Sequence, residues 1–165
     1  MVNSKTQEIL LEKIEKRYDF EISRIKRLDD KTNNILTVDG IIAALISGFG
    51  SLSVSFSEIT FIEWGAFLVF ALSLVIIVAS LWYGLKAYQL RDYMIVPDPP
   101  VLIGECEKMK PEEVIETLKI NYALAVIENE PINNEKASNI TKAIQLTLIS
   151  LILFALFSFL TILSK

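Results

Sequence analysis

Charged and apolar residues are separated into long blocks along this chain. Three stretches carry no charged side chain: Gly40 to Ser57, Trp64 to Leu85 and Ala143 to Ser164. Each comes close to or exceeds the roughly 20 apolar residues that a helix needs to cross a bilayer. The second and third stretches are apolar on every side, whereas a helix in a soluble bundle keeps a polar face. The pattern therefore predicts an all-α, multi-pass membrane protein with three transmembrane helices.

The blocks also set the expected boundaries. We expect a cytoplasmic amphipathic helix over residues 1–34, continuous with a first span at 35–57. A second span at 62–85 is followed by a cytoplasmic helical connection over 86–142 and by a third span at 143–164. No glycine or proline precedes the first span from Thr6 onward, so one long helix should leave the membrane.

Both polar segments carry narrow apolar stripes at the 3-4 spacing of a helix. The N-terminal stripe, which Glu21 breaks, consists of Leu11, Ile14, Tyr18, Ile25, Leu28 and Ile35. The stripe of the connection consists of Ile115, Leu118, Tyr122 and Ala125. Pro131 is expected to interrupt the connection helix, because proline lacks the amide hydrogen of the helical ladder. Each stripe needs a covering surface, either another part of the protein or another subunit.

The basic residues predict the orientation. Lysine and arginine are frequent in residues 1–38 and 86–142, absent from the link at 57–63, and reduced to Lys165 at the C-terminus. Because segments rich in lysine and arginine stay in the cytoplasm, the N-terminus and the connection should be cytoplasmic. The C-terminus should then lie outside the cell membrane.

Composition narrows the chemistry. The chain has no histidine and a single cysteine, so it lacks the commonest general base and the usual ligands of a zinc site. Its net charge of −4 gives no basic surface for nucleic acid. The carboxylates Glu128, Glu130 and Glu135 are explained by a solvated turn between two helices. We therefore expect no cofactor, no metal site and no enzyme activity.

Small and hydroxyl-bearing residues mark one side of each span. In the first span they are Gly40, Ala44, Ser47, Gly48 and Ser51. In the second and third spans they are Ser73, Ser80, Thr147 and Ser150. In lipid, such residues let helix backbones approach closely. They are candidates for helix packing, either within one chain or between subunits.

Asp39 is the one charged residue that comes close to the membrane interior at the start of the first span. A carboxylate there needs water or a partner. Three environments are compatible with the sequence: contact with interfacial water, pairing with Lys142 or Lys86, or a ring of carboxylates at the cytoplasmic mouth of an oligomeric pore.

Two motifs carry a family resemblance. "LDDKTNNILTVDG" leads from the charged helix into a membrane hairpin, and "NYALAVIENEPINNEKASNITKAI" follows the connector. This layout resembles the SLATT-type proteins, small membrane effectors associated with prokaryotic nucleotide-sensing conflict systems. The similarity covers about residues 10–160. The positions that match the family's recurrent residues in the juxtamembrane helix are Tyr122, Asn129, Asn134, Lys136 and Ala143.

The resemblance implies an oligomeric membrane effector that forms a pore or damages the membrane, and it implies no catalytic residue. The family has two membrane helices, whereas this chain has a third apolar segment. Two functions therefore compete: a homo-oligomeric, ion-conducting or membrane-perturbing protein in contact with lipid, and a membrane-anchored scaffold that binds a cytoplasmic protein partner.

Overall fold

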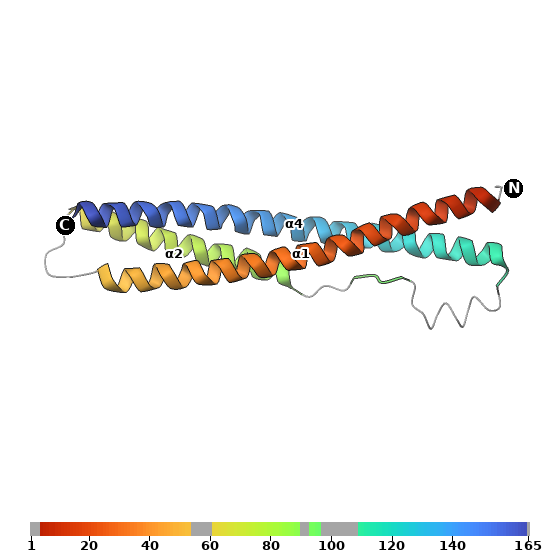
Figure 1. The fold of residues 1–165 in the computed structure, drawn as a ribbon, viewed down its shortest axis with the longest axis horizontal. Helices are drawn as coiled ribbons and strands as arrows, with labels where there is room; N and C mark the ends of the chain where they lie inside the picture. The colour runs from red at the N-terminus through yellow and green to blue at the C-terminus, as the bar shows by residue number, and fades with distance from the viewer. Residues whose placement is uncertain (1–3, 54–60, 90–92, 97–108, 165) are drawn as a thin grey trace. The chain divides into compact units, whose positions relative to one another are not determined.

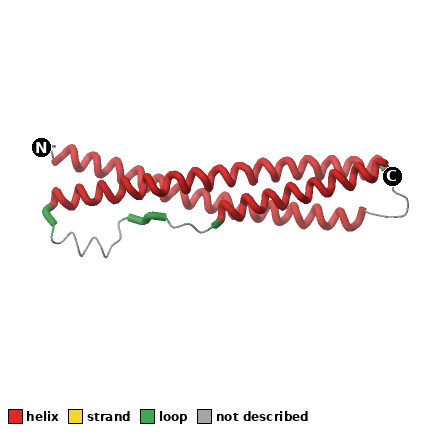
Figure 2. The backbone as a smooth tube through the Cα atoms, turned by 180° about the vertical axis from the view of Figure 1, so that it is seen from behind, coloured by secondary structure: helices red, strands yellow, loops and turns green. Residues whose placement is uncertain are grey.

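A computed structural model describes residues 4–53, 61–89, 93–96 and 109–164, apart from the side chains of Ser4 and of residues 50–53. Most of these residues form helices α1 (Ser4–Ser53), α2 (Phe61–Tyr88) and α4 (Pro111–Leu163), as Figure 1 shows. Figure 2 shows no strand among them. Each helix contains a stretch long and apolar enough to cross a membrane. The prediction of an all-α, multi-pass membrane fold is confirmed.

The buried side chains of each helix recur with a period of seven residues. On α1 they are Tyr18, Glu21, Leu28, Thr32, Asp39, Ile42 and Ile46. On α2 they include Ala66, Ser73, Ser80 and Ala87. On α4 they include Tyr122, Asn129, Lys136, Ala143, Ser150 and Phe157. This period is that of helices packed side by side in a left-handed coiled coil, and we call these residues the seam.

The chain divides into two compact units. The polar unit comprises residues 1–28 and 90–135, and the span unit comprises residues 29–89 and 136–165. All three predicted spans fall within the span unit. Helix α1 continues without a break through the expected boundary at residues 34–35.

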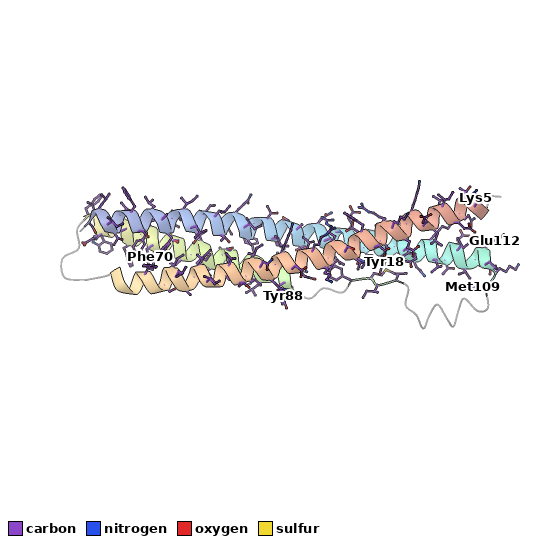
Figure 3. The ribbon with its side chains drawn as sticks, in the orientation of Figure 1. Lys5, Tyr18, Phe70, Tyr88, Met109 and Glu112 are labelled. Carbon is purple, nitrogen blue, oxygen red and sulfur yellow. The ribbon has the colours of Figure 1, made fainter. Side chains whose placement is uncertain are left out.

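Aromatic packing holds the polar unit together. The rings of Tyr18 and Tyr122 lie 5.2 Å apart, and both pack with Ala125 and Val96. Tyr18, labelled in Figure 3, also accepts a 2.9 Å hydrogen bond through its hydroxyl oxygen from the Val96 amide. Leu11, Ile14 and Leu118 border this core. The two apolar stripes therefore cover each other within one chain.

The expected interruption at Pro131 is wrong, because α4 continues through it. A proline inside a helix costs about 3 kcal/mol, so contacts on both sides must hold the helix together. Asn129 exchanges hydrogen bonds of 3.0 and 2.9 Å with the backbone of Met94. Asn133 donates a 2.9 Å hydrogen bond to the carboxylate of Glu21. Glu128 and Glu130 consequently lie on a continuous helix and not on a turn.

The span unit has an aliphatic core with aromatic neighbours. Ile42 and Ile46 of α1 meet Ile77 of α2, and Phe70 and Phe154 border them. The core is close-packed at Gly84 of α2, where an added Cβ would lie 2.8 Å from a methyl carbon of Leu36. Helices α1 and α2 therefore approach each other at a position that only glycine fills without a shift.

Candidate intramembrane polar site

One residue from each helix meets at a polar site inside the span unit. The Ser80 hydroxyl of α2 donates a 2.6 Å hydrogen bond to Oδ2 of Asp39 on α1. The Thr147 hydroxyl of α4 donates a 2.6 Å hydrogen bond to Oδ1 of the same carboxylate. Asp39 and Ser80 are fully buried, and Thr147 is 8% exposed. Such short hydroxyl–carboxylate contacts are typical of charge-assisted hydrogen bonds.

The two hydroxyls have a second acceptor within reach. The backbone carbonyl of Ala143 lies 2.8 Å from the Ser80 oxygen and 2.9 Å from the Thr147 oxygen. The two hydroxyl oxygens lie 2.9 Å from each other. Because each hydroxyl has a single hydrogen, Asp39 and the Ala143 carbonyl are alternative acceptors. Loss of the carboxylate would therefore leave both hydroxyls with an acceptor.

A second polar layer lies two turns away on α2, at about 10 Å for seven helical residues. The hydroxyl of Ser73 lies 3.1 Å from the hydroxyl and 3.1 Å from the carbonyl oxygen of Ser150. Ser150 in turn donates a 3.0 Å hydrogen bond to the Ser73 carbonyl. We call the two layers, which comprise Asp39, Ser80, Thr147, Ser73 and Ser150, the polar line. It connects all three helices within otherwise apolar packing.

The observed environment of Asp39 differs from two of the three that the sequence suggested, and the ring of carboxylates in an oligomer stays a prediction. Its partners are hydroxyls of the same chain, and its burial leaves no contact with interfacial water. Lys142 lies instead over the ring of Tyr83, 5.4 Å from the centroid. Lys86 is exposed on α2. Within a single chain the carboxylate is enclosed by the seam and does not line a surface.

The small residues of the spans separate into two groups. Ser73, Ser80, Thr147 and Ser150 meet inside the chain. The other group lies on an exposed side of α1 and comprises Gly40, Ala44, Ser47 and Gly48. An added Cβ at Gly40 or Gly48 would have no atom within 4 Å outside its own helix. The side chain of Ser51 lies outside the described residues.

Charged side chains add a second set of buried contacts. Glu21 is fully buried in the polar unit, 3.2 Å from Arg17 and 3.5 Å from Arg24. Arg24 also donates a 2.8 Å hydrogen bond to Asn134. In the span unit, Lys136 is nearly fully buried and pairs with Asp29. No group of three or more His, Cys, Asp or Glu side chains that could hold a metal occurs among the described residues.

The seam positions of Asp39, Gly84 and Glu21 were missed in the sequence, although a signal was present. Asp39 continues the 3-4 stripe of α1, four residues after Ile35, and so falls on the seam. Gly84 follows Ile77 by one heptad. Glu21 read as a break in its stripe, but it occupies a seam position and is neutralised by Arg17 and Arg24.

Comparisons with known proteins add no relative. No family model, curated protein or solved structure matches this chain.

Proposed function

We propose that this chain is the subunit of a homo-oligomeric membrane protein that conducts ions or permeabilises the bilayer. The observation that carries the proposal is the enclosed carboxylate of Asp39, held by hydroxyls from two other helices. Charged side chains within spans are costly, and they commonly mark substrate or ion pathways. A simple membrane anchor has no use for such a group.

The polar line is the part of the protein that ions meet in the active state. In the described chain it is buried between α1, α2 and α4, so an ion path along it needs a different arrangement of the helices or several subunits. Three spans are too few to enclose an aqueous path, and a path therefore needs several subunits. The exposed side of α1 at Gly40, Ala44 and Gly48 supports this assembly, because small residues let a helix of another subunit approach closely.

The distribution of basic residues supports a cytoplasmic location for the polar unit. Residues 1–38 and 86–142 carry most of the lysines and arginines, and they stay in the cytoplasm. The single cysteine, Cys106, tests this directly. A membrane-impermeant maleimide should label it only after cells are permeabilised. Labelling of Cys106 in intact cells would indicate that the connection lies outside the cell and would contradict the proposed orientation.

The decisive experiment counts subunits and measures flux on the same preparation. Native mass spectrometry of the protein in lipid nanodiscs should give four or more subunits. Liposomes that contain the protein should release ions, and Asp39→Asn should change the rate or the selectivity severalfold. The amide is close in size to the carboxylate, and Ser80 and Thr147 retain the Ala143 carbonyl as acceptor, so the variant should fold. Flux with unchanged rate and selectivity contradicts a role for Asp39.

A scaffold is the second candidate, and one observation favours it. Ile120, Leu124 and Ile127 form an exposed apolar stripe on α4 within the polar unit. A scaffold would use this stripe to bind another protein and would not need Asp39. A protein that is monomeric or dimeric in nanodiscs and supports no flux would favour this function over the pore.

A further inference from the structure

Two exposed faces of the polar unit have opposite charge. The basic face of α1 consists of Ile9, Lys13, Lys16, Phe20, Ser23 and Arg27. The acidic face of α4 consists of Glu113, Glu116, Ile120, Leu124, Ile127 and Pro131. Both faces follow the 3-4 spacing, and each extends over five helical turns, about 27 Å. The faces are thus matched in length and opposite in sign.

Each face combines charge with apolar surface. On the basic face Phe20 is 48% exposed, and the guanidinium groups of Arg17 and Arg27 lie 5.4 and 5.6 Å from its ring centroid. On the acidic face Ile120 and Ile127 are 53% and 65% exposed. Charged residues around an apolar centre are typical of protein–protein interfaces. Lys16 also pairs with Glu12 of its own helix, so Lys13 and Arg27 carry more of the attraction.

The contacts within the polar unit fix the levels of the two faces. Tyr18 contacts Tyr122 and Arg24 contacts Asn134, so residue numbers rise in the same direction along α1 and α4, and the two helices are parallel. The two contacts have offsets of 104 and 110 residues, and their mean of 107 gives the levels used here. At these levels Phe20 comes opposite Ile127. Lys13 and Lys16 then come level with the stretch between Glu116 and Glu128. A ring of identical chains about an axis along these helices keeps every level, because rotation adds no shift.

We propose that the basic face of α1 docks on the acidic face of α4 in a second copy of this chain. This inference rests on the proposed homo-oligomer, and it names a contact between subunits that lies outside the predicted spans. The contact is heterologous, since each subunit offers both faces, and repetition of such a contact closes a ring when the rotation between neighbours divides a full turn evenly. Charge complementarity selects a second copy over an unrelated partner, because one chain carries both matching surfaces.

Charge reversal tests the attraction. Lys13→Glu with Lys16→Glu should weaken subunit association about tenfold, and so should Glu116→Lys with Glu128→Lys, the two carboxylates that flank the level of these lysines. The chain with all four changes should recover association to within about threefold, because the two faces again have opposite sign. Lys26→Glu with Lys110→Glu is the control for loss of basic charge off the basic face, and it should associate normally. Failure of the fourfold variant to recover overturns the proposal.

Cross-linking tests the geometry without reversing charge. In a Cys106→Ser background, Phe20→Cys chains and Ile127→Cys chains with different tags are reconstituted together and oxidised. Mixed dimers should form at least about tenfold more than in either variant alone. Equal yields in the single variants would indicate a two-fold contact and overturn the proposal.

The outcomes separate this inference from the proposed function. Four or more subunits without mixed dimers would overturn the docking faces alone. A monomer without flux would overturn both.

Discussion

The two units of this protein use the same seven-residue period but fill it differently. In the polar unit the seam holds tyrosine rings, and Glu21 is neutralised by two arginines. In the span unit it holds isoleucine together with alanine, serine, threonine and glycine, and Asp39 is held by hydroxyls. Water drives large apolar side chains together, whereas lipid gives no such drive and leaves close approach and hydrogen bonds to join helices. The contrast shows how one helix pattern adapts to two solvents.

The largest effect is expected from the aromatic seam. Tyr122→Ala should cost about 3–5 kcal/mol in the polar unit, because it removes a buried ring and leaves a cavity beside Tyr18. Both tryptophans, Trp64 and Trp82, lie on α2 in the span unit. In Tyr122→Ala, circular dichroism should therefore show loss of helix at a lower denaturant concentration than in the unchanged protein. Tryptophan fluorescence should change at the same denaturant concentration in both.

The matched control for this change is Leu10→Ala, an exposed position of the polar unit that should stay within about 0.5 kcal/mol. Coincident shifts of both signals in Tyr122→Ala would show that the two units unfold as one.

A smaller effect is expected where α1 and α2 approach most closely. Gly84→Val should cost about 1–3 kcal/mol, because the new side chain collides with Leu36. Gly65→Val, on the same helix, is the matched control, since an added Cβ there meets no atom outside its helix. Tryptophan fluorescence during titration with dodecyl sulfate measures the stability of both variants. Equal losses in the two variants would mean that the close approach at Gly84 contributes nothing specific.

The hydroxyl contacts of the span unit should contribute less still. Ser73→Ala removes the reciprocal contact with Ser150 and should cost about 0.6 kcal/mol, the average for hydrogen bonds between membrane helices. Ser158→Ala serves as control, because that hydroxyl bonds only its own helix at Phe154. The same titration with dodecyl sulfate measures the stability of both serine variants. A loss well above 2 kcal/mol would make the polar line a main source of stability and not a functional feature.

The smallest effect is a pH dependence confined to the polar unit. Burial raises the pKa of the Tyr122 hydroxyl, and Glu15 and Asp19 raise it further. A raised pKa in the folded state means that stability is fully present below the ordinary tyrosine value, near 10, and is lost as the pH rises above it. Circular dichroism in denaturant should show this loss, and Tyr122→Phe should reduce it. An unchanged slope in the variant would assign the loss to other groups.

The sequence predicted the helices well, because their apolar blocks are long and uninterrupted. It predicted the local effect of Pro131 wrongly, since the contacts of Asn129 and Asn133 come from segments distant in sequence. The surroundings of Asp39 were missed for the same reason: Ser80 and Thr147 lie 41 and 108 residues away. The apolar stripe of one helix predicts which side of that helix is buried. Which residues of the other helices contact that side depends on the register of those helices.

The seam of the polar unit joins segments made at very different times. Glu21 and Asn133 are 112 residues apart, and at roughly 5–20 residues per second a ribosome needs about 6–22 s to cover that distance. During this interval the start of α1 has left the ribosome without its partner, while the membrane hairpin is already being inserted. A nascent chain that stalls before α4 therefore presents a bare amphipathic helix to chaperones and proteases. Closure of the polar unit therefore requires that α4 has been made at least through Asn133.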